Sequence, residues 1–335
     1  IFALPTAMTS SVKERSGFMT VGTVGGSLAA ALATVFLVPY AENNGYLKAA
    51  IIVAVVSFLA MSLISLFGKE RYKVKEEVLE KPASLRDTWE YLIHNKYLLY
   101  FYAYRMISGS IAVSMLIYVA KYCLGDVKYM SMVVAISVIP ICILFLFSGK
   151  IFKRFDKIVV YRFCMIATIL MNAITLFVGY QNRTLAIACL VVIAVLAILP
   201  SILMGAIPQD CVEYGTYKTE TRKEGITFAL QTFANKLTAA VATIITGGVL
   251  TFVGYDVAAE KAATEAHKVV EIAVSQATVS GMWKASFIVP IIGQLLAIGF
   301  LFAYNLRDKD VQIMSDCNAG KITKAEAEAL LSRKY

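Results

Sequence analysis

Long apolar runs separated by short charged segments extend along this chain. Each run is near the roughly 20 residues that one helical crossing of a bilayer requires, so the pattern predicts about eight membrane-spanning helices. We place them at residues 17–40, 46–68, 97–123, 129–149, 158–179, 184–207, 225–252 and 281–305. The longest charged segment between runs, residues 69–96, has a helix start signal at Ser84. It predicts a short helix on the membrane surface.

Composition places the chain among all-α integral membrane proteins. Of its 335 residues, 59% are hydrophobic and 16% are charged, whereas soluble domains carry about 25% charged residues. The six cysteines include no Cys-x-x-Cys pair, which argues against a disulfide or zinc framework. No nucleophile, base and orienting group are grouped as catalysis requires. We therefore expect neither an enzyme nor a protein with a metal or cofactor.

Basic residues gather on one side of the predicted membrane. With the boundaries above, 22 of the 32 lysines and arginines fall on one side, seven fall on the other, and Arg105, Arg162 and Lys236 fall within runs. The positive-inside rule makes the richer side the cytoplasm, so we expect the C-terminal tail and residues 209–224 to be cytoplasmic. The net charge of +9 is thereby explained by topology, without a nucleic-acid partner.

Lys236 is the first candidate site residue. It lies about 11 residues into the seventh run, roughly 16 Å deep in a core about 30 Å thick. A charge at that depth costs about 2.5–3.5 kcal/mol and is commonly functional. Its predicted helix face otherwise carries small or hydroxylated residues, namely Gly225, Ala229, Thr232, Ala240, Thr243 and Gly247. This face is typical of a helix that lines a hydrated cavity; a structural pairing with one carboxylate is the alternative.

Arg105 and the segment before Lys236 supply the other candidates. Arg105, about 12 Å into the third run, either lines the cavity and holds a carboxylate or extends its side chain to the cytoplasmic interface. In the sixth run, Pro200 and Pro208 each remove a backbone donor and are expected to bend the helix. We predict that four residues after these prolines form a cytoplasmic gate: Asp210, Glu213, Tyr214 and Glu224. The carboxylates of Asp210 and Glu213 could pair with Lys218, Arg222 or another half of the protein.

The same segment resembles the signature of the glycoside–pentoside–hexuronide:cation symporters. The resemblance rests on Asp210, Val212-Glu213-Tyr214-Gly215, Tyr217-Lys218, Arg222-Lys223-Glu224-Gly225, Gln231-Thr232-Phe233 and Lys236. It implies a sugar or glycoside transporter driven by Na+ or H+, in which Lys236 matches the lysine of the family's eleventh helix and Thr232 lies one turn before it. Around Arg105 the match is poor, so Arg105 could bear on this member's own substrate.

An internal repeat indicates how the helices are grouped. A shift of 209 positions places residues 27–36 on residues 236–245, both rich in alanine and threonine, which makes the first and seventh runs equivalent. A six-helix repeat is the arrangement of the major facilitator fold. We therefore expect residues 1–68 to hold the end of helix 4 and helices 5 and 6 of an N-terminal bundle. Residues 69–96 would be the middle loop, 97–306 a complete C-terminal six-helix bundle, and 307–335 the tail. On this reading, roughly the first four helices precede Ile1.

Three smaller segments carry predictions. Residues 149–157 read as a tight turn at Gly149, either a degraded facilitator motif or an ordinary basic loop. Residues 254–280 read as a polar external segment with helical propensity. In the tail, Thr323 and Glu326 have the spacing of a capping box, which predicts one short helix.

We conclude from the sequence that the chain is part of a multi-pass plasma-membrane symporter. It would act by alternating access, as a monomer in the lipid bilayer, on a sugar or glycoside. Two alternatives remain open. One is a facilitator-fold transporter of lipids or drugs, which would favour a more apolar cavity face, and the other is a non-transporting membrane sensor of the same fold.

Overall fold

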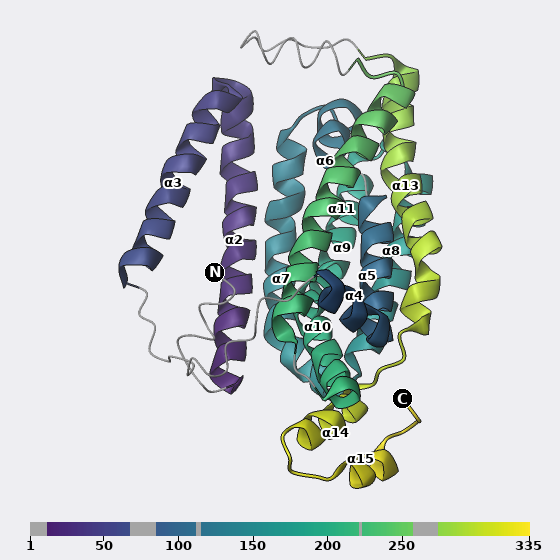
Figure 1. The fold of residues 1–335 in the computed structure, drawn as a ribbon. Coiled ribbons are helices and arrows are strands. Elements are labelled where there is room, and N and C mark those ends of the chain that lie inside the picture. Colours follow the sequence, from purple (N-terminus) through teal and green to yellow (C-terminus); the bar gives the residue numbers. More distant parts are fainter. Residues whose placement is uncertain (1–11, 68–84, 112–114, 221–222, 257–273) are drawn as a thin grey trace.

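The computed structural model describes residues 12–67, 85–111, 115–220, 223–256 and 274–335, and every regular element in these ranges is a helix (Figure 1). The helices before the C-terminal tail are, in chain order, α2 (Val12–Asn44), α3 (Tyr46–Phe67), α4 (Leu85–His94), α5 (Lys96–Ser110), α6 (Leu116–Tyr118), the π-helical turn η2 (Val119–Cys123), α7 (Lys128–Arg154), α8 (Lys157–Val178), α9 (Arg183–Leu196), α10 (Ile198–Thr219), α11 (Glu224–Phe252) and α13 (Gln276–Ala303). The tail contributes α14 (Asp308–Asn318) and α15 (Lys324–Leu330).

Six helical segments of the described chain are long and apolar enough to cross a bilayer. They are α3, α7, α8, α9 together with α10, α11 and α13. Each corresponds to one of the predicted spans, and their bounds differ from the predicted ones by at most about five residues, except that α10 continues to Thr219 instead of ending at 207. The first predicted span is also helical, as α2, although its apolar part is limited to Ala29–Ala41. The chain is therefore a multi-pass membrane protein.

The third predicted span, residues 97–123, is not one helix, and that prediction was wrong. Helix α5 ends at Ser110, and α6 and η2 follow as separate short turns. Just before the break, a Cβ on Gly109 would lie 2.5 Å from Cγ2 of Thr238. Only glycine therefore lets α5 approach α11 so closely at this level.

The predicted turn at Gly149 was also misplaced. Helix α7 continues through Gly149 to Arg154, and only Phe155 and Asp156 separate it from α8. Lys153 and Arg154 occupy the last turn of α7, where basic side chains favour the helix dipole. In the sixth span the effect of proline is local. Since Pro200 cannot donate to the carbonyl of Leu196, α9 ends at Leu196, whereas α10 continues past Pro208 to Thr219.

The helices form one bundle with a hairpin beside it (Figure 1). Helices α2 and α3 form the hairpin, and α2 contacts α7, where the hydroxyl of Ser131 donates to the carbonyl of Thr34 at 3.1 Å. Helices α14 and α15 lie beyond one end of the bundle, which we call the tail side. An aromatic cluster occupies this end, with its members drawn from α5, α8, α10 and the segment after α13: Tyr97, Phe101, Tyr104, Tyr161, Tyr214 and Tyr304.

Two of the short predicted helices are confirmed. Helix α4 lies within the charged segment, with Tyr91 buried and Trp89 exposed. Helix α15 begins after Thr323, and the predicted capping box is present. The side chain of Thr323 accepts from the backbone N–H of Glu326, and the side chain of Glu326 accepts from the backbone N–H of Thr323. Helix α14 was not predicted. The external segment predicted at 254–280 lies largely outside the described residues.

Candidate functional site

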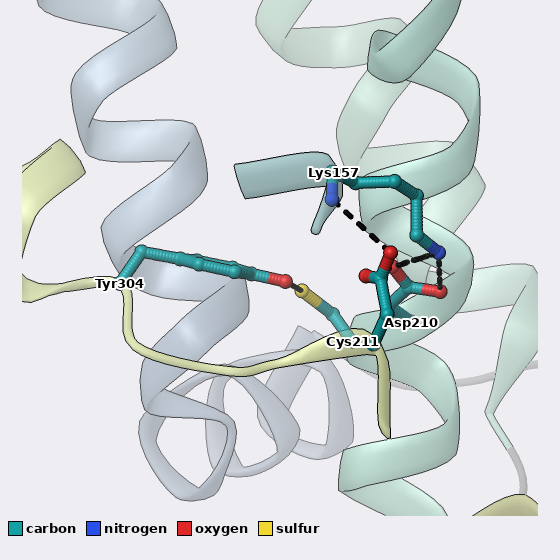
Figure 2. Close-up of polar contacts among 5 residues, drawn as sticks. Lys157, Asp210, Cys211 and Tyr304 are labelled. Carbon is teal, nitrogen blue, oxygen red and sulfur yellow. Dashed lines mark hydrogen bonds and ion pairs between the residues drawn. The ribbon is translucent and has the colours of Figure 1, made fainter. Parts of the chain in front are cut away.

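The charged motif of the sixth span forms the last three turns of α10. There, Nζ of Lys157 lies 2.5 Å from Oδ2 of Asp210 and 3.7 Å from Oδ1 of Asp308. The backbone N–H of Lys157 also donates to Asp308 at 3.1 Å (Figure 2). One lysine at the start of α8 therefore joins α10 to α14. We expected the motif's carboxylates to pair with Lys218, Arg222 or another half of the protein. Asp210 pairs with Lys157 instead, and Arg222 lies outside the described residues.

Neighbouring residues of the motif contact the tail and the start of α5. The thiol of Cys211 lies 3.6 Å from the hydroxyl of Tyr304 (Figure 2), and its carbonyl accepts from Asn95 at 2.7 Å. The side-chain amide of Asn318 donates to Oε2 of Glu213 at 2.9 Å and to its carbonyl at 3.0 Å. Two of the predicted gate residues, Asp210 and Glu213, thus lie in an interface between the bundle and its tail.

The motif's Tyr214 and Gly215 are both buried, and their neighbours account for the residue type at each position. The ring of Tyr214 is edge-on to Tyr97, with centroids 4.8 Å apart, and it also contacts Tyr335. A Cβ on Gly215 would lie 2.8 Å from both Nδ2 of Asn95 and the hydroxyl of Tyr91. Glycine is therefore required where the α4–α5 junction packs against α10.

Asp310 fixes the end of the tail. Its side chain is fully buried and accepts from the backbone and hydroxyl of Ser332, at 2.9 and 2.5 Å, and from the hydroxyl of Tyr335 at 2.5 Å. Burial by itself would raise the pKa of Asp310, but these hydrogen bonds to the carboxylate keep it below its ordinary value. We call Asp310, Ser332 and Tyr335 the tail lock. Nothing in the sequence marks Ser332 and Tyr335 as partners of Asp310, which is over 20 residues away.

Lys236 lies on the face of α11 that does not pack against the bundle. Ala234 and Thr238 are buried on the packed face, whereas Lys236, Thr232 and Thr243 are exposed on the other. The predicted stripe of small and hydroxylated residues is therefore left uncovered by the described helices. Thr232 donates to the carbonyl of Phe228 at 3.0 Å. Within the described ranges, no carboxylate lies within ion-pair distance of Lys236.

Arg105 lies at a different place from Lys236. It is half-buried on α5 beside Gly109, where α5 meets Thr238 of α11. Lys236 and Thr238 are about 200° apart around the helix at 100° per residue, so Arg105 and Lys236 lie towards opposite sides of α11. Within the described residues, Nε of Arg105 and the hydroxyl of Thr238 are buried without a hydrogen-bond partner. Thr238 was not singled out from the sequence, because a threonine in an apolar helix ordinarily bonds to its own backbone.

Glu224, the fourth predicted gate residue, cannot be placed in the interface between the bundle and its tail. Glu224 is the first residue of α11, and its side chain lies outside what the structure describes. In the described ranges, no three His, Cys, Asp or Glu side chains are grouped so that they could hold a metal ion. The arrangement offers charged and hydroxylated side chains that can bind a polar molecule, and a polar interface that joins the bundle to its tail.

Comparison with known proteins identifies relatives over nearly the whole chain. A family model described as "MFS/sugar transport protein" matches residues 1–308. The "Putative sulfoquinovose importer" of Escherichia coli is 26% identical over 92% of this chain, and the chain covers 64% of that protein. The "Putative 2,3-dihydroxypropane-1-sulfonate exporter" of Salmonella typhimurium is 26% identical, over 96% of this chain and 69% of its own length. The "Uncharacterized symporter YjmB" of Bacillus subtilis is 27% identical, over 76% of this chain and 56% of its own length. The chain thus spans slightly less than two thirds of the importer.

Proposed function

Since the chain belongs to the MFS/sugar transport protein family, which makes it a transporter and not an enzyme, we propose that it carries a sugar by cation-coupled symport with alternating access. The observation that supports this proposal is Lys236. It is a lysine in the middle of a membrane-length helix, on a face that the described helices do not cover. An ammonium group at mid-membrane depth needs an anion or water near it, and a transport cavity supplies both.

The substrate we favour is a sugar that carries a negative charge. Neither Lys236 nor Arg105 has a carboxylate partner among the described residues, so an anionic substrate would neutralise one of them during binding. Two relatives are named for sulfonates, sulfoquinovose and 2,3-dihydroxypropane-1-sulfonate, and a sulfonate is an anion throughout the physiological pH range. A neutral glycoside, of the kind that the resemblance to glycoside–pentoside–hexuronide symporters suggests, is the second candidate.

We assign the chain to the later part of a two-bundle transporter. Helices α2 and α3 would be the last two of the N-terminal bundle, and α5 to α13 the six-helix C-terminal bundle, in agreement with the hairpin that stands beside α7. The uncovered face of α11 would then face the N-terminal bundle. The 22-to-7 distribution of basic residues supports a cytoplasmic tail in the plasma membrane.

The tail side would serve as the cytoplasmic gate. Asp210 and Glu213 each bond to a residue of another element, Lys157 and Asn318, so opening this end requires those bonds to break or the elements to move together. Replacing both by Asn and Gln should slow turnover more than it weakens substrate binding. Unchanged turnover with lost binding would place the two residues in the substrate site instead.

The test of the proposed function uses the full-length protein in proteoliposomes with an imposed Na+ or H+ gradient. Uptake of labelled sulfoquinovose is compared with uptake of a neutral glycoside for the wild type, Lys236→Ala and Lys284→Ala. Lys284 is an exposed lysine of α13 and serves as the matched control. Losing a buried charge pair costs about 2–5 kcal/mol, so Lys236→Ala should reduce sulfoquinovose uptake at least about 30-fold, while Lys284→Ala does not.

Three outcomes would contradict the proposal. Undiminished gradient-driven uptake by Lys236→Ala would remove the lysine from the mechanism. Uptake of the neutral glycoside alone would refute the anionic substrate while leaving symport intact. No gradient-driven accumulation of either sugar would favour the lipid or drug transporter, or the sensor.

A further inference from the structure

A basic cleft lies at the tail-side end of α8, apart from both Lys236 and the gate residues. Its volume is about 110 Å³. The side chains that matter for its chemistry are three arginines, one amide, one carboxylate and one valine: Arg162, Arg307, Arg333, Asn305, Asp156 and Val159. Three positive charges against one negative charge make the cleft suited to an anion.

Arg162 forms a fixed part of this cleft. Its Nε and Nη2 atoms donate to the carbonyl of Leu301 at 3.3 and 3.2 Å, and Nη2 also donates to the carbonyl of Tyr304 at 2.5 Å and to Oδ1 of Asn305 at 3.3 Å. These bonds satisfy carbonyls at the end of α13, which would otherwise lack partners. The Nη1 group of Arg162 makes none of these hydrogen bonds, so its N–H groups can donate to another partner.

Arg307 and Arg333 are exposed, and neither has an ion-pair partner among the described residues. The carboxylate of Asp310, on α14, is engaged with Ser332 and Tyr335. Because Ser332 is tied to Asp310, the tail lock also holds Arg333 at the cleft. The fold thus positions the two guanidinium groups without an ion-pair contact among the described residues, which leaves their donors for a charge-assisted bond to an oxyanion.

The surroundings of the cleft decide which anion fits. Val159, 49% exposed, lines it, and Phe163 follows one turn further along α8 with 68% of its surface exposed. On α13, Phe302 is 49% exposed and lies under the guanidinium of Arg162, with 5.2 Å between the guanidinium carbon and the ring centre. Both helices are of membrane-spanning length and composition. An apolar surface therefore continues from the basic cleft into the region of the lipid chains.

This geometry points to a binding site for an anionic glycerophospholipid. The phosphate occupies the cleft between Arg307, Arg333 and the free Nη1 group of Arg162, and the acyl chains lie along Val159, Phe163 and Phe302. Basic clefts at membrane-helix ends are suited to anionic headgroups, and each basic side chain contributes about fivefold in affinity. The site is independent of the transported substrate, and with a cytoplasmic tail it belongs to the inner leaflet.

Native mass spectrometry of the detergent-purified chain tests this site. The protein is equilibrated with equal amounts of phosphatidylglycerol and phosphatidylcholine, as wild type and as the double variant Arg307→Gln/Arg333→Gln. The matched control is Lys150→Gln/Lys153→Gln, two exposed basic residues of α7 outside the cleft. The wild type and the control should retain phosphatidylglycerol preferentially, and the Arg-to-Gln variant should lose about 25-fold in its retention at about fivefold per arginine.

A charge-preserving variant and a free anion complete the design. Arg307→Lys/Arg333→Lys should retain most of the preference for phosphatidylglycerol. Equal retention of the two lipids by the wild type, or an unchanged preference in Arg307→Gln/Arg333→Gln, would overturn the site. Displacement of phosphatidylglycerol by inorganic phosphate at the same concentration would show that the cleft takes a free anion and would overturn the lipid assignment.

Discussion

Removal of Lys157 is the sharpest test of how the tail side is held together. The Nζ atom of Lys157 contacts carboxylates from two elements, Asp210 on α10 at 2.5 Å and Asp308 on α14 at 3.7 Å. The side chains of Lys157 and Asp210 are only 21% and 13% exposed. Lys157→Met would leave two poorly solvated carboxylates without their positive partner, so the free energy of unfolding should fall by about 3–5 kcal/mol.

The variant Asp210→Asn provides the matched comparison. It keeps the shape of the side chain, and Lys157 retains its contact with Asp308. Only a charge-assisted hydrogen bond is lost, so the expected decrease is smaller, about 1.5–3 kcal/mol. The double variant Lys157→Met/Asp210→Asn should be more stable than Lys157→Met, because only Asp308 then lacks a partner.

Thermal unfolding in detergent micelles, followed with a thiol-reactive dye, measures these differences. Cys211 is adjacent to Asp210 and fully buried, so the dye reports on opening of this interface in a background in which the other five cysteines are replaced by serine. The wild type should have the highest transition temperature, followed by Asp210→Asn, the double variant and Lys157→Met. If Asp210→Asn were as unstable as Lys157→Met, the argument that one lysine compensates two carboxylates would be refuted.

Three further predictions concern close packing, pH and topology. Gly215→Ala should lower the free energy of unfolding by about 1–3 kcal/mol, since the added Cβ would meet two side chains at 2.8 Å. Gly205→Ala, in the same helix, has open space around the added Cβ and should leave the stability unchanged. Thermal unfolding of the two variants measures the difference. The depressed pKa of Asp310 means that its contribution is complete above its unfolded-state pKa and is lost as pH falls through the lower folded-state value. Proteolysis of the tail should accordingly accelerate only below about pH 4, and in Asp310→Asn already at neutral pH. In intact cells a membrane-impermeant thiol reagent should label Asn43→Cys but not Lys324→Cys, and the reverse pattern would invert the proposed orientation.

The sequence was most informative where structure is determined locally. The apolar runs of α8 and α11 end at charged or glycine-containing segments, so their bounds could be predicted to within about two residues from spacing alone. The capping box at Thr323 is equally local, because both of its bonds join residues three positions apart. The stripe around Lys236 was predictable for the same reason, as helix periodicity alone determines which residues share its face.

The sequence was least informative where distant residues meet. The close approach of α5 to α11 depends on Gly109 and Thr238, which are 129 positions apart, so the pattern within residues 97–123 could not indicate it. The partners of Asp210 and Glu213 likewise come from α8 and α14, whereas we expected them to be Lys218, Arg222 or another half of the protein. The roles proposed for Lys236, Thr232 and Arg105 stay predictions, because they depend on a substrate and on a cavity wall.

The docking of the tail onto α10 has a consequence for biosynthesis. Asp308 follows Asp210 by 98 residues, and a ribosome that adds about 5–20 residues per second needs about 5–20 seconds to synthesise that interval. During this time α10 is already available for membrane insertion, and Lys157 has been made, but the partners of Glu213 and Tyr214 on the tail have not. The last turns of α10 therefore lack these contacts until the tail has been synthesised, so this interface forms only after the helices of the bundle are made.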